Sequence, residues 1–433
     1  MNKDQINLGV AGNPVSHSLS PELFKKYIEG HDLKFCYTRL LANTVSDIYR
    51  LINAYDIKGI NITSPFKESI LDLSDELSPY VKFTGAANTL LLKGKTKSLY
   101  NTDISGVQMP LTRILRGERA FSALVIGAGG AAKAAIKALK NLNVSTIFIT
   151  NRTKSKADAL ADQFGIISIN KPQVSKYAFD IIINTTSECP EILSHLLISE
   201  NTILYDAYYK KRPMEEIANN YNSQYLSGLD WLSEQGRVSY ALMTGISKTD
   251  FYCKQINNDH GKIKRIALIG MMGTGKSTIG KRLAEKLGYD FADMDKMIQD
   301  NEGLSITRIF ETKGEAFFRK LEKDLLKNII KRENIVISTG GGIIVDEENI
   351  VLLKEKCWNI LLYGSAENLS RIASDKNRPL LAGKDKIDEL NKIFNERKNK
   401  YYKTSDIVVC SDTDSYHNIS EFIYDDYSKS FLH

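Results

Sequence analysis

Cysteine is scarce in this chain, and the five cysteines that it has are widely spaced: Cys36, Cys189, Cys253, Cys357 and Cys410. They form neither a Cys-x-x-Cys pair nor a cysteine–histidine spacing, so we expect reduced thiols rather than disulfides or structural zinc. The N-terminal stretch MNKDQINLGVAG lacks the apolar core of a signal peptide, and no apolar run approaches membrane-spanning length. The sequence therefore predicts a cytoplasmic protein.

Strong charge of one sign is also missing. The net charge is +6, and lysine and arginine are scattered rather than gathered in a basic stripe, which argues against a nucleic-acid partner. The mild positive excess suits small anionic ligands such as phosphorylated cofactors. We find no internal repeat, no low-complexity tract and no sign of an obligate protein partner, so the expected partners are small molecules.

Short β-rich runs alternate with helical ones along almost the whole chain, as in INLGVAG, FCYTRL, GINIT, ALVIGAG and RIALIG. This alternation predicts an α/β protein with parallel sheets covered on both faces. A polar stretch at residues 253–265 marks the main boundary. The predicted domains are residues 1–103 with 235–252, residues 104–234, a linker at 253–262, and residues 263–433.

ALVIGAGGAAKAAIKAL reads as a strand, a glycine turn and a helix, in which Gly127, Gly129 and Ala132 match G-x-G-x-x-G/A. Such a turn lets a pyrophosphate approach the backbone at a helix N-terminus. The alternative is a glycine turn needed only for packing. The next strand ends at Arg152, where an NAD site usually has an acidic residue; an arginine suits a 2′-phosphate, so we predict NADP. The residues expected at this cofactor are Gly127, Ala128, Gly129, Gly130, Ala131, Asn151, Arg152, Thr153 and Gly228.

Two Ser-Pro pairs indicate helix starts in front of this motif. In GNPVSHSLSP (12–21), Ser20 reads as an N-cap with proline next, which places Ser18 and Ser20 where a carboxylate could bind. Simple capping would explain Ser20 but not Ser18. In NITSPFKES, Ser64-Pro65 predicts a second helix start with Lys67 in its first turn. Lys67 could act in proton transfer, although surface lysines are far commoner.

The ordered motifs GNPVSHSLSP, NITSPFKE, GAANT, NTDISG and GAGGAA resemble shikimate dehydrogenase, and EQG and TG extend the resemblance over about residues 5–252. The resemblance implies a two-subdomain fold with a Rossmann-like NADP domain, and NADPH-dependent reduction of 3-dehydroshikimate to shikimate. It makes Lys67 and Asp103 the acid–base pair. It implies that Ser18 and Ser20 bind the substrate carboxylate. The other residues that it implies at the substrate are Asn61, Thr63, Asn88, Tyr209 and Gln235.

The chain departs from that family in two places. It has NTTSECP (184–190) where the family usually shows Asn-Ala-Thr-Pro, and Trp231 in GLDWL where the family tends to have methionine. These changes leave the nicotinamide contacts and the strictness of substrate choice open. A first half that acts on quinate or a related cyclic polyol is therefore kept as an alternative.

GMMGTGKST (270–278) matches G-x-x-x-x-G-K-S between a strand and a helix. The loop backbone would wrap phosphates, with Lys276 at the β and γ groups and Ser277 on Mg²⁺. Asp293 and Asp295 follow on one side of the next strand; Asp293 suits the magnesium shell, and Asp295 could accept a proton from a substrate hydroxyl. The residues expected at the triphosphate are Gly273, Thr274, Gly275, Lys276, Ser277 and Thr278.

Further motifs follow. GEAFFRKLEKDLL places Arg319 and Glu322 on one helix face, although a solvated ion pair would look the same. DKNRPLLAG predicts a mobile segment with Arg378, able to close over the transferring phosphate. With FRKLE, GGG (340–342) and R-x-x-x-Y, the set resembles shikimate kinase over about residues 263–428, a P-loop fold of the nucleoside-monophosphate-kinase type.

The second resemblance implies phosphorylation of shikimate with ATP and Mg²⁺. It implies that Arg319 and Arg397 bind the shikimate carboxylate and that Asp295 contacts the reacting hydroxyl. Arg378 would belong to the lid, and Arg371 would lie near the adenine. Glu322, Gly341 and Gly342 complete the predicted substrate site, and Lys320 stands where the family often has arginine.

The two resemblances together predict a bifunctional enzyme of the shikimate pathway to chorismate and aromatic amino acids. The product of the first reaction would be the substrate of the second. We expect neither half to give the other a catalytic residue, so the two activities should be separable. The remaining alternative is that one half is a silent nucleotide-binding module that regulates the other.

Overall fold

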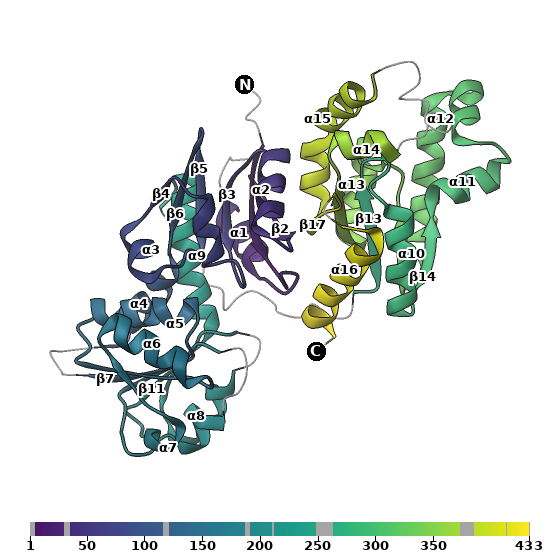
Figure 1. Cartoon of the computed structure of the whole chain (residues 1–433). Helices are drawn as coiled ribbons and strands as arrows, with labels where there is room; N and C mark the ends of the chain where they lie inside the picture. The colour runs from purple at the N-terminus through teal and green to yellow at the C-terminus, as the bar shows by residue number, and fades with distance from the viewer. Residues whose placement is uncertain are drawn as a thin grey trace. The chain divides into compact units, whose positions relative to one another are not determined.

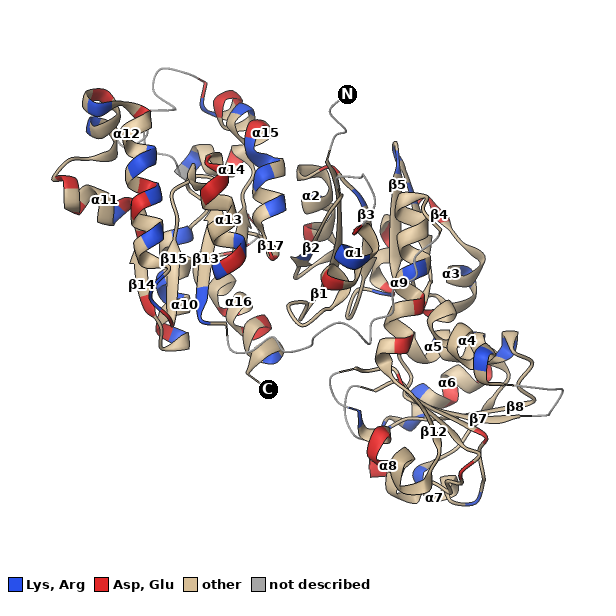
Figure 2. Ribbon diagram, turned by 180° about the vertical axis from the view of Figure 1, so that it is seen from behind, with Lys and Arg blue, Asp and Glu red and all other residues tan. Residues whose placement is uncertain are grey.

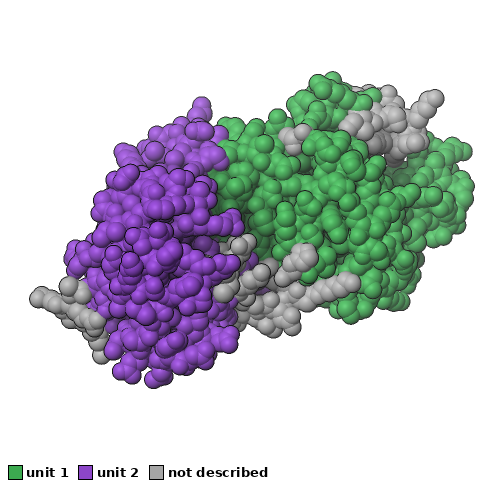
Figure 3. Space-filling model, turned by 60° about the horizontal axis from the view of Figure 1, so that its bottom comes forward, with its two compact units in different colours: residues 1–21, 32–66, 258–433 green, residues 22–31, 67–257 purple. Residues whose placement is uncertain are grey.

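The computed structural model describes residues 5–29, 35–115, 121–186, 191–209, 212–247, 263–372, 385–412 and 414–432. Arg378, the linker at 253–262 and part of NTTSECP lie outside these ranges. The chain forms two compact units, coloured in Figure 3. Unit 1 contains Met1–Pro21, Asp32–Phe66 and Asn258–His433, and unit 2 contains Glu22–His31 and Lys67–Asn257. Across the described residues, no helix has both the length and the apolar character to cross a membrane.

Unit 1 is built on parallel strands whose residues are mostly buried apolar side chains. The strand order is β14-β15-β13-β16-β17-β2-β1-β3, and every described pairing between these neighbours is parallel. Strands buried on both faces read as continuous apolar runs, as RIALIG and IVIS do. The strands are β1 (Ile6–Gly12), β2 (Phe35–Leu41), β3 (Ile57–Ile62), β13 (Arg265–Gly270), β14 (Asp290–Asp293), β15 (Ile335–Ser338), β16 (Trp358–Tyr363) and β17 (Ile407–Cys410).

Helices cover this sheet (Figure 1). Helix α12 changes direction at Gly314, whose φ of 82° lies in the left-handed region that favours glycine. Figure 2 shows lysine and arginine interspersed with acidic residues along α12 and α15, as the scattered charge predicts. The helices are α2 (Val45–Ala54), α10 (Lys276–Leu287), α11 (Met294–Glu302), α12 (Ile306–Ile329), η4 (Ile343–Val345), α13 (Glu347–Lys356), α14 (Ala366–Ile372), α15 (Lys386–Thr404) and α16 (Tyr416–Phe431).

The N-terminal strands and the C-terminal half share one sheet and one core. β17 pairs in parallel with β2, so that Val408 lies opposite Leu40. Val10 and Val15 belong to the same buried cluster as Leu268 and Tyr427. Residues from both ends of the chain therefore share one hydrophobic cluster in unit 1.

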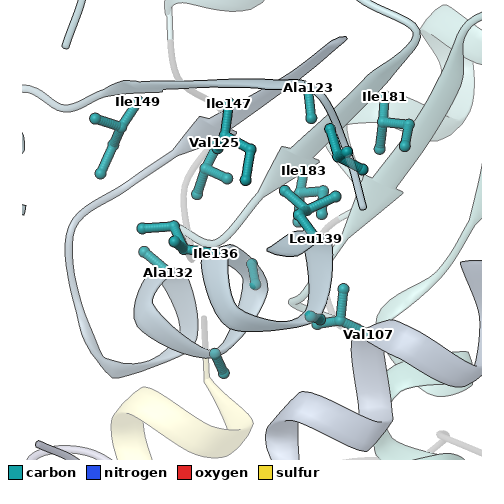
Figure 4. Packing of buried hydrophobic residues seen from close by; sticks show 14 of the residues in the cluster. Val107, Ala123, Val125, Ala132, Ile136, Leu139, Ile147, Ile149, Ile181 and Ile183 are labelled. Carbon is teal, nitrogen blue, oxygen red and sulfur yellow. The ribbon is translucent and has the colours of Figure 1, made fainter. Parts of the chain in front are cut away.

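Unit 2 contains a second parallel sheet with the order β12-β11-β10-β7-β8-β9. In Figure 4, Ala132, Ile136 and Leu139 of α5 face Val125 and Ile147 of this sheet. Its strands are β7 (Ser122–Ile126), β8 (Thr146–Thr150), β9 (Ile167–Ser168), β10 (Ile181–Asn184), β11 (Ile203–Asp206) and β12 (Gln224–Leu226).

Further elements of unit 2 precede this sheet in the chain, connect its strands or follow it. β5 (Thr89–Lys93) pairs antiparallel with β6 (Thr96–Tyr100), which pairs in parallel with β4 (Glu76–Leu77). Helix α1 (Ser20–Ile28) begins in unit 1 and continues into unit 2. The others are η1 (Ser69–Leu73), α3 (Pro79–Thr84), α4 (Asp103–Ile114), α5 (Gly130–Asn141), α6 (Lys154–Phe164), α7 (Lys171–Val174), η2 (Glu191–His195), α8 (Pro213–Tyr221) and α9 (Gly228–Thr244).

The predicted α/β class with parallel sheets is confirmed, but one predicted helix is wrong. Ser64-Pro65 opens a turn, and a short 3-10 helix follows only at Ser69. Lys67 therefore lies in this turn and not in the first turn of a helix. By contrast, α1 does begin at Ser20 with proline next, as predicted.

Candidate active sites

Lys67 and Asp103 form an ion pair in unit 2. Lys67 Nζ lies 2.5 Å from Asp103 Oδ2, and the two side chains are 23% and 8% exposed. Asp103 is the first residue of α4, and the Lys67 carbonyl accepts a hydrogen bond from Ala87 N. The structure thus brings together the predicted acid–base pair although 36 positions separate the two residues.

Trp231 is a residue whose role the sequence did not reveal. Its indole Nε1 donates a 3.2 Å hydrogen bond to Asp103 Oδ1, the oxygen that does not face Lys67. The ring is 5% exposed and leaves no room for a side chain at Gly106. Lys67 and Trp231 therefore fix both oxygens of the Asp103 carboxylate. Trp231 stands out in the sequence only as a departure from the family pattern.

A buried hydrogen-bond network joins two predicted substrate residues of unit 2. Asn88 Nδ2 donates to Gln235 Oε1 at 3.3 Å and to Thr102 Oγ1 at 3.0 Å, and Thr102 Oγ1 donates to Gln235 Oε1 at 3.2 Å. Sequence reasoning missed Thr102, although it lies inside NTDISG, directly before Asp103. Because buried networks hold amide groups in one orientation, these residues form a preorganised polar surface.

Four other predicted substrate residues lie in unit 1 at the carboxyl ends of β1 and β3. Ser18 Oγ lies 3.2 Å from Ser20 Oγ and accepts a hydrogen bond from Ser20 N at 3.3 Å. Asn61 Oδ1 accepts from Tyr37 OH at 2.8 Å. Thr63 packs so closely on Gly12 that a side chain there would overlap it. The pairing of β1 with β3 thus places both segments at one edge of the sheet.

The first glycine loop connects β7 to α5 in unit 2. Gly127 has a φ of 113°, and a side chain there would collide with Thr185. Gly129 precedes α5, and a side chain added to it would meet open space. A phosphate could therefore approach the backbone at the N-terminus of α5. A side chain at Gly130 would touch Lys67, which places the loop beside the ion pair.

The other predicted cofactor residues of unit 2 differ in their surroundings. Asn151, Arg152 and Thr153 follow β8, where Arg152 is exposed. Lys154 Nζ forms an ion pair with Asp158 Oδ1 at 2.6 Å. A side chain at Gly228 would overlap the backbone at Tyr209, so this glycine serves close packing. Arg152 is thus an exposed cation directly after β8, where the prediction places the 2′-phosphate.

The P-loop of unit 1 connects β13 to α10. Lys276 Nζ donates to the carbonyls of Gly270 and Met271 at 2.9 and 2.8 Å, and Ser277 Oγ lies 3.2 Å from Ser338 Oγ. Thr274 is buried and donates to Met271 O. A positive φ at Gly273 and Gly275 gives the loop its tight curvature.

A cavity of about 370 Å³ opens against this loop. Its walls bring together most of the residues predicted for the kinase reaction, from the P-loop, β14–α11, α12 and α15. They also include Tyr416 of α16, which no sequence motif indicated and whose hydroxyl donates to Gly273 O at 2.7 Å. The predicted residues lining the cavity are Gly273, Gly275, Lys276, Ser277, Thr278, Asp295, Arg319, Glu322, Gly341, Gly342 and Arg397.

Two predicted residues line neighbouring cavities. Asp293 is the last residue of β14 and caps α11 by accepting from Lys296 N, whereas Asp295 lies in the first turn of α11, so the prediction that both follow on one side of the strand is wrong. Asp293 lines a second cavity, which shares Ser277 and Thr278 with the first. Arg371 lines a third cavity together with Gly273 and Tyr416. The described residues contain no cluster of three or more His, Cys, Asp or Glu with metal-site geometry. A hydroxyl and a carboxylate nevertheless suit Mg²⁺ that is held largely by phosphate and water.

The three glycines at 340–342 make room for charged side chains. A side chain at Gly340 would collide with Glu322 and Asp295, and one at Gly342 would collide with Arg319. The Gly341 carbonyl accepts hydrogen bonds from Arg397 Nη1 at 3.1 Å and from Tyr401 OH. Hydrogen bonds therefore join the GGG motif to the R-x-x-x-Y motif.

Glu322 is a buried carboxylic acid beside two arginines. Its Oε2 pairs with Arg319 Nη1, whereas Oε1 is buried without a hydrogen-bond partner among the described residues. Burial raises the pKa of Glu322 from 4.5 to about 7, although Arg319 lowers it. Glu322 therefore partly neutralises Arg319 and holds its guanidinium at the wall of the cavity.

The geometry defines a nucleotide-dependent enzyme with a dinucleotide site in one unit and a P-loop phosphotransferase site in the other. Family models match in three places: "Shikimate dehydrogenase substrate binding domain" at residues 10–90, "Shikimate / quinate 5-dehydrogenase" at 112–203 and "Shikimate kinase" at 272–427.

Curated relatives and solved structures agree with the family models. A shikimate dehydrogenase (NADP(+)) of Maridesulfovibrio salexigens is 34% identical over 56% of this chain and 93% of its own length. A shikimate kinase of a Sulfurihydrogenibium species is 45% identical over 32% of this chain and 83% of its own. The crystal structure of shikimate dehydrogenase from Aquifex aeolicus covers 57% of this chain and 96% of its own, with 32% identity and a TM-score of 0.53.

Another curated relative is matched over only part of its length. The chain covers 27% of a Thermotoga maritima bifunctional shikimate kinase/3-dehydroquinate synthase, at 50% identity. The matches confirm both resemblances: the chain belongs to the shikimate dehydrogenase family in its N-terminal part and to the shikimate kinase family in its C-terminal part.

Replacing Trp231 with phenylalanine should lower the kcat of ketone reduction about tenfold, because a hydrogen bond to a charged group contributes roughly 1.5–3 kcal/mol. The KM for the ketone and the phosphorylation rate should stay within about twofold of wild type. Tyr205→Phe is the matched control: it removes a buried hydrogen bond, to Gly106 O, without touching Asp103. Equal effects of the two variants would show that Trp231 does not act through Asp103.

The buried acid in the kinase site should give stability a distinct pH dependence. Because the pKa of Glu322 is raised by folding, the folded chain keeps a proton between about pH 4.5 and 7 that the unfolded chain has lost. Its stabilising contribution is complete below about pH 4.5 and is lost as the pH rises through about 7. Wild type should therefore lose stability relative to Glu322→Gln across this window, by up to about 1.4 kcal/mol per pH unit.

Differential scanning calorimetry across pH 4.5–8 measures this difference as a change in Tm. Glu315→Gln is the matched control, since exposed Glu315 also pairs with Arg319. A wild type that gains stability relative to Glu322→Gln as the pH rises would contradict the buried-acid assignment.

Proposed function

We propose that this chain is a bifunctional enzyme of the shikimate pathway. It reduces 3-dehydroshikimate to shikimate with NADPH and then phosphorylates shikimate to shikimate 3-phosphate with ATP and Mg²⁺. The observation that carries the proposal is the cavity beside the P-loop, which collects Lys276, Asp295, Arg319 and Arg397 around one space. The Lys67–Asp103 ion pair next to the dinucleotide loop gives independent support for the first reaction.

In the reduction, bound NADPH supplies the hydride, and the side chains supply the rest. Lys67 Nζ stabilises the negative charge that develops on the ketone oxygen and donates a proton to it. Asp103 keeps the ammonium in place through the ion pair, and a proton taken up from water restores the ammonium form of Lys67 after each turnover. We assign the substrate carboxylate to Ser18 and Ser20.

In the phosphorylation, two guanidinium groups orient the substrate. We assign its carboxylate to Arg319 and Arg397, which both line the cavity, because a guanidinium group can pair with a carboxylate through two hydrogen bonds. Asp295 accepts the proton of the reacting hydroxyl, while Lys276 turns from the loop carbonyls to the phosphates and neutralises their charge. Ser277 and Asp293 would hold Mg²⁺, and Arg371 would lie near the adenine.

Some assignments stay predictions. These are the domain bounds 1–103 with 235–252, 104–234 and 263–433, the role of Arg378, the cytoplasmic location and the lack of an obligate protein partner. The quinate alternative also stays open, because the family model for residues 112–203 includes quinate 5-dehydrogenases. A panel of 3-dehydroshikimate and 3-dehydroquinate with NADPH decides between these substrates. A silent regulatory half is disfavoured because Lys67 with Asp103, and Lys276 with Asp295, are all in place.

A coupled assay tests the proposal directly. Lys67→Ala should lower reduction at least about a hundredfold, because a positioned acid–base group contributes on that order, and should leave phosphorylation of added shikimate unchanged. Lys276→Ala should do the reverse. NADPH oxidation and ADP release, followed separately in the full chain, measure the two reactions. Loss of both activities in either folded variant would refute separate sites.

A further inference from the structure

A buried carboxylate from the C-terminal helix contacts the N-terminal substrate loop. Asp426 of α16 is 2% exposed. Its Oδ1 accepts hydrogen bonds from Val15 N at 2.6 Å and Ser16 N at 3.2 Å, and its Oδ2 accepts from Ser16 Oγ. These donors lie in the loop after β1 that carries Ser18. About 410 positions separate the two sides of the contact.

The contact is strong because the carboxylate is shielded from solvent and accepts several hydrogen bonds. Burial raises the pKa of the Asp426 carboxyl, while the hydrogen bonds from Ser16 and Val15 and the charge of Arg39 oppose that rise. Charge-assisted hydrogen bonds of this kind are about twice as strong as neutral ones. A buried carboxylate that loses its donors would pay the full desolvation cost. The loop conformation and the side chain of Asp426 are therefore linked.

Arg39 holds a further part of the loop. Arg39 of β2 donates from Nε and Nη2 to the Ser18 carbonyl at 3.1 and 2.6 Å, and its guanidinium lies 5.2 Å from the Trp358 ring centre. Ser18 N donates to Val15 O at 2.9 Å, which closes the turn that Asp426 binds. Both Trp358 and Asp426 come from the kinase half. The backbone that presents Ser18 is thus held by Arg39 of its own half and by Asp426 of the kinase half.

We propose that Asp426 is a positioning residue for the carboxylate site of the dehydrogenase half. It fixes the Val15–Ser16 backbone so that the hydroxyls of Ser18 and Ser20 are oriented before the substrate arrives. Preorganisation of this kind lowers the entropic cost of binding. The inference rests on the proposed function, because it takes the carboxylate role of Ser18 and Ser20 from there. Asp426 acts through the loop and not on the substrate itself, so the prediction that neither half gives the other a catalytic residue is unaffected.

Steady-state kinetics of the full chain test the assignment. Asp426→Asn keeps the shape of the side chain but removes its charge and one acceptor, so the KM for 3-dehydroshikimate should rise about tenfold or more. The kcat of reduction, the KM for NADPH and both kinase constants should stay within about twofold. Asp425→Asn, an exposed neighbour on the same helix, is the matched control and should behave as wild type.

A second variant keeps the test decisive if Asp426→Asn does not fold. Ser16→Ala removes only the hydroxyl that donates to Asp426 Oδ2, and should raise the same KM severalfold with the Tm unchanged. In a double-mutant cycle, the effects of Ser16→Ala and Asp426→Asn on kcat/KM for 3-dehydroshikimate should be non-additive, as expected of groups in contact.

Two results would overturn the assignment: an unchanged 3-dehydroshikimate KM in both variants, or proportional losses in reduction and phosphorylation, which indicate a merely structural role. Wild type separates this failure from failure of the proposed function. If wild type does not reduce 3-dehydroshikimate, the proposed function is wrong. If it does so and the variants match it, only the positioning role of Asp426 is wrong.

Discussion

The parallel pairing of β2 with β17 is the constraint on which unit 1 depends. Each of the two strands also pairs on its other side, β2 with β1 and β17 with β16. The pairing removes two open strand edges that would otherwise invite association with other chains. It also brings α16 against the loop after β1, which permits the Asp426 contact. Because Val10 and Leu268 belong to one buried cluster, the two families meet here in a shared core.

The chain contains two phosphate-binding loops because its two nucleotides need different geometries. After β7, Gly127 turns the chain so that a pyrophosphate can lie at the N-terminus of α5, beside Lys67. After β13, a longer loop that curves at Gly273 and Gly275 ends in Lys276, which suits a triphosphate. Both loops follow parallel strands, where ligands bind in open α/β sheets. Helix α16 contacts two loops of unit 1. Tyr416 contacts the P-loop, and Asp426 contacts the loop after β1 that carries Ser18.

Local sequence patterns predicted much of this structure. Strand–helix alternation predicted the α/β class, and the spaced glycine motifs located both phosphate-binding loops. Both kinds of pattern depend only on residues that are neighbours in the sequence. Ser64-Pro65 was misread because a Ser-Pro pair is compatible with either a helix start or a turn. Trp231 stood out in sequence, but its bond to Asp103 depends on how α9 packs on α4. The Asp426 contact could not be predicted, since no local pattern relates residues some 410 positions apart.

The most direct test of the shared sheet is hydrogen exchange at one amide of β2. Arg39 N donates to Asp406 O across the junction, whereas Thr63 N donates to Ala11 O within the N-terminal strands and serves as the internal reference. In native-state exchange followed by NMR, the two amides should be protected to the same extent, within about tenfold. An Arg39 amide that exchanges as fast as an exposed edge amide, while Thr63 stays protected, would contradict the shared sheet.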